Sequence, residues 1–328
     1  MGRLHAPTLP DRVVRNEPPS PPHTKPARPQ RTPRCLRRPS EASARSRRDD
    51  RMMRDIEAVQ CSTGPFWAYD LERAFDLIAE AGFESIELMI TRDPRTQDPA
   101  TCLELAAARG LRIGAVHGPF LMLNRTVWGL RAEDKIERGI ELCRALGAST
   151  YVVHPPYPLE ERFARWLGHP EEHPHDVRVA VETMYPKWVA GRRLQAYRWL
   201  RPHELVAHCP WVVMDTSHLA LAREDLLEAF EVLLPKLVHI HLSDQAGDNK
   251  DGHLSMGEGV LPLDRLLLEV ARSDYSGTVA LELSVARHSG QPRKIVRMLS
   301  RNRERVSSFL DARPNAAELS PNPTGESL

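Results

Sequence analysis

Short apolar runs alternate with amphipathic helical patterns eight times between Asp55 and Leu310. Within the helical segments apolar residues recur at helical spacing, as Leu71, Phe75 and Ile78 do at i, i+4 and i+7. Eight strand–helix repeats in roughly 255 residues fit a closed (β/α)8 barrel better than an open doubly wound sheet. We therefore predict one α/β domain with strands at residues 56–61, 85–90, 112–117, 150–154, 177–182, 211–215, 237–242 and 278–283, and a helix at about residues 192–208.

The two ends of the chain have a different composition. Residues 1–51 contain ten prolines, 13 Lys and Arg, and 5 Asp and Glu, with almost no apolar periodicity. Such a segment is predicted to be a disordered basic extension, read either as a basic arm or transit peptide or as a dispensable tail. The predicted organisation is a disordered extension at 1–51, a catalytic barrel at 52–312 and a disordered tail at 313–328.

Composition narrows the class of partner and the compartment. Outside the first 51 residues, 32 Lys and Arg face 39 Asp and Glu, so the barrel has no general attraction for nucleic acid, although a local basic patch is compatible with this balance. No run of about 18 apolar residues occurs, so no membrane span is expected. The five cysteines form no close pairs, which favours reduced thiols and a cytoplasmic protein.

Polar residues stand at the carboxyl ends of six of the expected strands. Because barrel enzymes place their chemistry at that face, these side chains are expected to converge on one mouth. Four carboxylates and five imidazoles together would be costly to bury without a cation, and their atoms suit zinc, manganese or iron. The candidate metal ligands are His117, His154, Glu182, Asp215, His218, His241, Asp251, His253 and Glu282.

The segment Leu237–Gly259 concentrates this pattern. It begins as a strand that ends near His241 and continues as a Gly-rich polar loop that holds Asp251 and His253 one residue apart. Other cofactor signatures are missing from the chain. The sequence after the first strand, STGPFW, is not a dinucleotide fingerprint, and no P-loop or G-x-S-x-G motif occurs.

The motifs VHGPF, VVHPP, AVETMYP, MDTSH, HIHLSD, DGHLSMGEG and ALELS, in this order, resemble the xylose-isomerase-like TIM barrel superfamily. The resemblance spans about residues 55–310. That superfamily includes sugar and sugar-phosphate isomerases and epimerases, and the endonuclease IV branch of AP endonuclease family 2. It implies a TIM barrel with a divalent-metal centre at its mouth.

The resemblance also implies residue roles. In single-metal epimerases the ion is held by residues that match Glu182, Asp215, His241 and Glu282, and the two Glu exchange the substrate proton. In the endonuclease branch a three-metal cluster is implied, with one ion on His117, His154 and Glu182, a second on the four epimerase ligands, and a third on His218, Asp251 and His253.

The chain departs from the endonuclease pattern at Thr183-Met184-Tyr185-Pro186, where the repair enzymes have a Gly-containing continuation. The loop after His117 begins Gly118-Pro119-Phe120, and Phe120 is expected either to stack on a base or sugar or to pack in the core. On this basis we predict a divalent-metal-dependent isomerase or epimerase, with Glu182, Glu282 and His218 as catalytic residues.

The predicted cofactor is one to three zinc or manganese ions, and the predicted partner is a sugar or sugar phosphate, with nucleic acid less favoured. The alternative is a trinuclear-zinc phosphodiesterase acting on abasic-site DNA. A third hypothesis is a non-catalytic metal-binding barrel, which needs fewer open ligands than this chain offers.

Overall fold

A computed structural model describes residues 57–119, 127–189 and 192–312 of the chain. The predicted disorder of residues 1–51 and 313–328 lies outside these residues, and so does Phe120. In the described part, no helix is long and apolar enough to cross a membrane. The four described cysteines, Cys61, Cys102, Cys143 and Cys209, are buried and form no disulfide.

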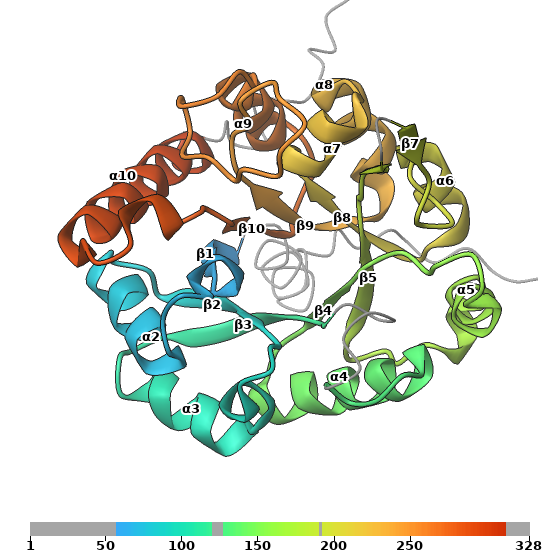
Figure 1. Cartoon of the computed structure of the whole chain (residues 1–328), viewed down its shortest axis with the longest axis horizontal. Helices are drawn as coiled ribbons and strands as arrows, with labels where there is room; N and C mark the ends of the chain where they lie inside the picture. The colour runs from blue at the N-terminus through green and yellow to red at the C-terminus, as the bar shows by residue number, and fades with distance from the viewer. Residues whose placement is uncertain (1–56, 120–126, 190–191, 313–328) are drawn as a thin grey trace, which may run out of the picture. The chain divides into compact units, whose positions relative to one another are not determined.

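Eight parallel strands close into a barrel, which confirms the predicted fold class (Figure 1). Each neighbouring pair is hydrogen-bonded, and the last strand pairs with the first. In barrel order the strands are β1 (Glu57–Ser62), β10 (Thr278–Leu281), β9 (Leu237–Leu242), β8 (Trp211–Asp215), β5 (Arg178–Glu182), β4 (Thr150–Val153), β3 (Arg112–His117) and β2 (Ser85–Met89).

Helices surround this barrel, and local sequence signals place their ends. The Asp70 carboxylate accepts the backbone N–H of Arg73 at 2.7 Å and so caps the first surrounding helix. Gly147 ends the helix at Ala132–Leu146 with φ of 72°, which glycine adopts without strain. The helices are α2 (Leu71–Glu80), α3 (Pro99–Ala107), α4 (Ala132–Leu146), α5 (Glu161–Leu167), α6 (Pro202–His208), α7 (Thr216–Ala222), α8 (Leu226–Leu233), α9 (Leu263–Arg272) and α10 (Pro292–Asp311).

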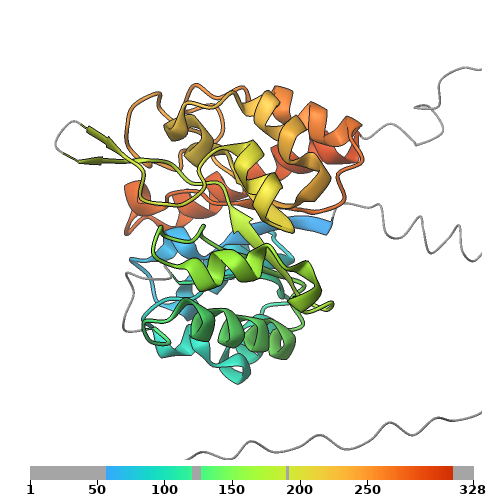
Figure 2. The same cartoon turned by 90° about the vertical axis from the view of Figure 1, so that its right-hand side faces the viewer.

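The predicted helix at 192–208 is wrong over most of its length. Residues Lys187–Val189 (β6) and Arg192–Leu194 (β7) instead pair as an antiparallel hairpin that projects from the barrel (Figure 2). Helix α6 begins only at Pro202, because proline lacks an N–H and favours the first helical position. The Glu204 carboxylate accepts the N–H groups of Leu200 and Arg201 there, at 3.0 Å each.

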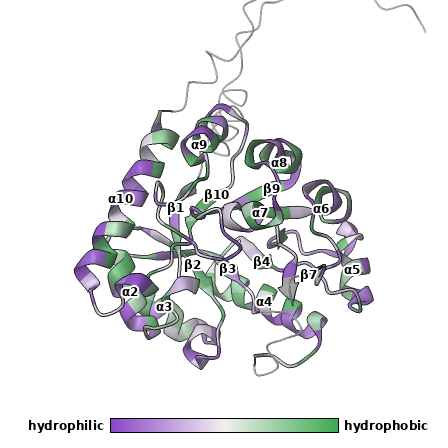
Figure 3. Cartoon of the chain, turned by 45° about the horizontal axis from the view of Figure 1, so that its top comes forward, coloured by the Kyte–Doolittle hydropathy of each residue, from purple (hydrophilic) through white to green (hydrophobic). Residues whose placement is uncertain are grey.

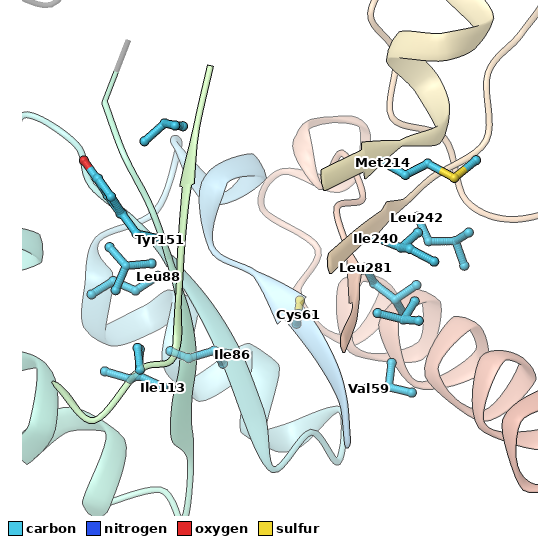
Figure 4. Close-up of a cluster of buried hydrophobic side chains, with 14 of the residues drawn as sticks. Val59, Cys61, Ile86, Leu88, Ile113, Tyr151, Met214, Ile240, Leu242 and Leu281 are labelled. Atoms are coloured by element: carbon cyan, nitrogen blue, oxygen red, sulfur yellow. The ribbon is translucent and has the colours of Figure 1, made fainter. Parts of the chain in front are cut away.

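The two faces of the strands carry different kinds of buried side chain. Outward aliphatic side chains, among them Ile86, Leu88, Ile240 and Leu281, pack against the helices (Figure 4). The surrounding helices carry hydrophobic and hydrophilic residues on one and the same helix, as an amphipathic cover requires (Figure 3). Because side chains alternate along a strand, the residues between the outward ones point into the barrel. Polar and charged residues occupy many of these interior positions.

Candidate metal centre

The interior face of the strands carries a polar layer toward their carboxyl ends. In β5, Ala180 and Glu182 share the inward face, and in β9 His239 and His241 do the same. Strand pairing sets Asp215 beside His241, and Ala280, two residues before Glu282, is also paired with His241. Parallel register therefore brings side chains from distant parts of the sequence to one level of the barrel.

Glu182 lies at the centre of this layer and faces imidazoles with both carboxylate oxygens. Its Oε2 lies 3.5 Å from His117 Nε2 and 3.2 Å from His154 Nε2. Its Oε1 lies 2.7 Å from His241 Nδ1 and 3.5 Å from His218 Nδ1. The carboxylate thus spans two groups of nitrogen donors, which is the arrangement of a bridging ligand.

A second group surrounds His241. Its Nδ1 lies 3.7 Å from Asp215 Oδ2 and 3.1 Å from Glu282 Oε2. With Glu182 these residues place four potential ligand atoms within 4.8 Å of one another. All four side chains are buried.

A third group lies nearer the solvent. His218 Nε2 is 3.4 Å from Asp251 Oδ2, and His253 Nε2 is 3.0 Å from Asp251 Oδ1. The Nδ1 of His218 lies 2.9 Å from the Thr183 carbonyl oxygen, so an Nδ1–H donated there leaves Nε2 as the ligating nitrogen. Asp215 caps α7 by accepting the His218 N–H at 2.7 Å, which fixes the start of the helix at Thr216 and the place of His218 in its first turn.

Asp244 holds the loop that carries Asp251 and His253. Its carboxylate accepts the N–H groups of Gly257, Gly259 and Leu261 at 2.9, 3.1 and 3.0 Å. A bridge between Asp244 and Leu254 closes the loop. These hydrogen bonds show that Asp244 holds the loop in shape.

Glu87 is the residue that the sequence left without a role. It is fully buried in β2, and its Oε2 lies 2.8 Å from His241 Nε2 and 3.0 Å from His239 Nε2. His239 also contacts the Thr278 hydroxyl through Nδ1. His239, two residues before His241 in β9, therefore lies one layer below it in the barrel. The only sequence signal that Glu87 is inside the barrel is its place between the outward residues Ile86 and Leu88.

The carboxylates of the centre raise the pKa values of two of its imidazoles. Burial opposes charge on His218, but Asp215, Glu182 and Asp251 together raise its pKa to about 10. Burial likewise opposes charge on His253, yet Glu282, Asp251 and Asp215 raise its pKa to about 9. Without a metal ion these imidazoles neutralise the carboxylates by holding protons.

The residues fit a divalent metal centre. Glu182 Oε2, Asp215 Oδ2 and Glu282 Oε2 are buried and have no hydrogen-bond partner within the described chain, which is costly unless a cation satisfies them. Imidazole nitrogens with carboxylate oxygens are typical ligands of zinc and manganese. Burial also lowers the pKa of His154 to about 4, so this imidazole is neutral and able to ligate at neutral pH.

A cavity of about 930 Å³ opens above the centre. Its floor includes metal-ligand candidates, and its wall includes Phe66, Trp67, Tyr69 and Arg92. This volume accommodates a substrate of ordinary small-molecule size or the exposed part of a larger one.

Tyr185 and Lys187, both after β5, close another side of the cavity. The Tyr185 hydroxyl donates to Asp251 Oδ2 at 3.0 Å, and its ring lies 5.0 Å from the His218 ring. Lys187 Nζ lies 3.3 Å from the Tyr185 oxygen and 4.3 Å from its ring centroid. The TMYP segment, which departs from the endonuclease pattern, therefore contacts the third ligand group directly.

Three further histidines, His169, His173 and His175, lie close together in the sequence and are only in part exposed to solvent. His173 is buried and stacks on Trp166 at a ring-centroid distance of 3.9 Å, while His169 and His175 are exposed. The Trp166 ring provides the apolar face that this imidazole covers. None of the three lines the cavity above the centre.

Comparison with known proteins places the chain among characterised folds. A family model described as a xylose isomerase-like TIM barrel matches residues 75–302. An uncharacterized protein of Mycobacterium leprae (strain TN) is 30% identical over 255 residues, covering 71% of this chain and 91% of that protein. "Probable endonuclease 4" of Mycoplasma pneumoniae is 26% identical over 179 residues, covering 48% of this chain and 63% of that protein.

Solved structures agree on the architecture. A D-tagatose 3-epimerase-like protein superposes with a TM-score of 0.56 and 20% identity, covering 76% of this chain and 98% of that one. At this identity the likeness shows the fold alone.

Proposed function

The chain belongs to the xylose isomerase-like TIM barrel family, and we propose that within this family it is a divalent-metal-dependent phosphodiesterase with a multinuclear centre. The observation that supports this most is the position of Glu182. Both of its oxygens face imidazoles, Oε2 toward His117 and His154 and Oε1 toward His241. A carboxylate so placed serves as a bridge between ions better than as a proton carrier, because both oxygens already face imidazole nitrogens.

Three sets of residues, of which the first two share Glu182, would hold the ions. His117, His154 and Glu182 form one set, and Glu182, Asp215, His241 and Glu282 form another. The third set is His218, Asp251 and His253. Bound divalent ions supply Lewis-acid polarisation of phosphoryl oxygens and lower the pKa of a water nucleophile.

The chain's own residues position the substrate and support this centre. Lys187 lines the cavity with its ammonium group and would offset part of the charge of a phosphate group. Tyr185 holds Asp251 in place through its hydroxyl. The exposed ring of Trp67 in the cavity wall would contact the part of the substrate next to the phosphate.

A second candidate, an isomerase or epimerase acting on a sugar or sugar phosphate, is favoured by Glu282. Its Oε2 faces His241 at 3.1 Å, whereas Oε1 lies within 3.4 Å of where a Cβ at Gly64 would stand, in the cavity wall. Glu282 therefore directs one oxygen toward the cavity and is suited to act as a base. Proton exchange by paired carboxylates also requires Glu182, and both oxygens of Glu182 face imidazoles.

Metal stoichiometry and two activity assays separate these functions. We expect up to three ions per chain in the purified protein and metal-dependent nicking of a duplex that contains an abasic site. The isomerase assay is exchange of solvent deuterium into a panel of ketoses. One ion per chain, deuterium exchange with a ketose and no hydrolysis of any phosphodiester would contradict the proposal.

The double variant Asp251→Ala, His253→Ala sharpens the comparison. It removes two of the three ligands in the outer set and leaves the Glu182, Asp215, His241 and Glu282 set intact. The variant should lose one ion and, with it, phosphodiester hydrolysis, because the ion at His218, Asp251 and His253 contributes to charge stabilisation. Deuterium exchange, if the parent shows any, should persist.

A further inference from the structure

A second cavity, of about 520 Å³, lies outside the metal centre between α10 and the loop at residues 255–258. In Figure 1, α10 and the loop that precedes α9 lie beside each other at the rim of the barrel. None of its lining residues belongs to the three ligand sets. Four basic side chains line it, and we call it the α10 groove: Lys294, Arg297, Arg301 and Arg305.

The basic residues of the α10 groove share one face of the helix. Arg297, Arg301 and Arg305 are spaced four residues apart, so successive guanidinium stems are about 6 Å apart along the helix axis. All three side chains are exposed, and so is Lys294. The groove therefore presents a row of cations rather than one isolated charge.

One carboxylate, that of Glu258, also lines the groove, and it lies 3.8 Å from the guanidinium of Arg287, which is not a groove residue. Arg305 is paired with Asp264 at 2.7 Å, as expected for an ordinary surface arginine. Within the described chain, Lys294, Arg297 and Arg301 take part in no ion pair. The excess of acidic residues in the chain after residue 51 makes an uncompensated cluster of this kind more notable.

Polar contacts hold the opposite wall of the groove in place. The buried Asn302 accepts the N–H of Met256 at 2.9 Å and donates to the Ser255 hydroxyl at 2.6 Å. Gly257 has φ of 84°, and a Cβ there would lie 3.3 Å from Arg305. The backbone can pass this close to the guanidinium because glycine has no side chain.

The same loop joins the groove to the metal centre. Ser255 follows His253 by two residues, which limits their Cα separation to about 7 Å. The end of the α10 groove at Ser255 is therefore close to His253, one of the residues of the His218, Asp251 and His253 set. An extended ligand could reach the cavity mouth from there.

We propose that the α10 groove binds the phosphate backbone of a nucleic-acid strand. A single phosphate would contact one or two of the cations, whereas a chain of regularly spaced phosphates can engage the whole row. The contacts are to backbone charge and carry no base recognition. This inference deepens the proposed function, since it names nucleic acid as the class of substrate.

The test is binding of a fluorescein-labelled intact duplex to the full-length, metal-loaded protein, followed by fluorescence anisotropy at several salt concentrations. We compare the parent with Arg297→Gln, Arg301→Gln. The matched control is Arg138→Gln, Arg165→Gln, which removes two exposed charges from α4 and α5. Residues 1–51, with their 13 basic residues, are present in every protein and contribute equally.

We expect the groove variant to bind about tenfold more weakly or worse, and the slope of log K against log salt to fall by about 2. The control variant should bind like the parent. A further variant, Arg297→Lys, Arg301→Lys, keeps the charge and should restore most of the affinity. Melting temperatures equal to that of the parent establish that each variant is folded.

Two outcomes overturn the inference. One is equal affinity and equal salt slope for the parent and the groove variant. The other is unchanged duplex binding with loss of pyrophosphate binding in a thermal-shift titration, which would make the groove a site for free phosphate compounds. Because binding of an intact duplex is scored without turnover, a parent that binds through the groove but cleaves no phosphodiester refutes the proposed function alone.

Discussion

Glu182 decides at the scale of single residues what the centre can do, because its two oxygens face different imidazoles. Glu282 differs from it in having one oxygen toward the cavity. The two carboxylates are therefore predicted to have different roles, although Glu182 ends β5 and Glu282 directly follows β10. The sequence pattern around Glu182 and Glu282 does not distinguish their roles.

Changing Glu182 to Gln should abolish phosphodiester hydrolysis, with a loss of more than about a hundredfold, because an amide is a poor bridging ligand. Two ions should also be lost, since Glu182 belongs to two of the ligand sets. Glu282→Gln should remove one ion at most. Turnover and elemental analysis of both variants check this, and parental stoichiometry in Glu182→Gln would rule out the bridge.

Glu87 is predicted to orient His241 through the bond at 2.8 Å to its Nε2. Glu87→Gln weakens that acceptor without a change of size, and affinity at the Glu182, Asp215, His241 and Glu282 set should fall about 10- to 100-fold. Competition with a chelating dye measures the metal affinity of each ligand set. The control Glu84→Gln changes an exposed residue next to β2 and should leave affinity unaltered.

If Glu87→Gln unfolds the barrel, affinity alone is uninformative. The absorption spectrum of cobalt-substituted protein then serves as a second measurement, because it reports the ligand field at His241 in whatever fraction remains folded. An unchanged spectrum and unchanged affinity would make Glu87 a structural residue only.

At the scale of elements, the segment between β5 and β6 reaches across the mouth to the loop after β9. Tyr185 connects the two through Asp251, while the ring of Tyr185 covers His218. The hairpin β6–β7 continues directly from this segment. The outer ligand set therefore depends on two loops that meet only in the folded barrel.

Tyr185→Phe should loosen the outer ion selectively, because it removes the donor to Asp251 and keeps the ring. We expect a few-fold to tenfold lower affinity at the His218, Asp251 and His253 set, in line with loss of a partner behind a ligand. Tyr157→Phe, at a tyrosine that does not line the cavity above the centre, is the control. Equal loss in both variants would argue against a specific contact.

For the whole molecule, metal binding and folding are expected to be coupled through protons. The pKa of His218 is raised to about 10 and that of His253 to about 9, against about 6.5 in an unfolded chain. In the metal-free protein these raised values stabilise the fold below pH 6.5, and this contribution is lost as the pH rises through 9 and 10. A metal ion must displace the same protons, so its affinity increases with pH.

Removal of metal should therefore lower the melting temperature more at pH 8 than at pH 6. At neutral pH, ion binding to the outer set should release close to two protons, one from each imidazole. Differential scanning calorimetry with and without chelator, and titration calorimetry in buffers of different ionisation enthalpy, measure the two effects. A chelator effect that shrinks as pH rises would contradict the linkage.

Local sequence patterns were sufficient to predict the fold class of this protein. The strand–helix alternation predicted the barrel, since periodicity of apolar residues reports which face of each element is buried. The same alternation predicted that His117, His154, Glu182, Asp215 and His241 would meet at one face, because parallel strands end there together. The helix at 192–208 was predicted wrongly, as the capping at Pro202 and the pairing of β6 with β7 compete with a helical pattern.

Tertiary structure alone decided which atoms face one another. Glu87 and His241 are separated by 154 residues, and their contact depends on the register and closure of the barrel. The two-sided contacts of Glu182 depend on side-chain rotamers of four strands and a helix start. The basic row on α10 was readable as an amphipathic face, but it became a groove only because Asn302 holds the loop of Ser255 and Met256 against it. Sequence periodicity is a local property, whereas contact between distant side chains is set by how the closed barrel aligns its strands and loops.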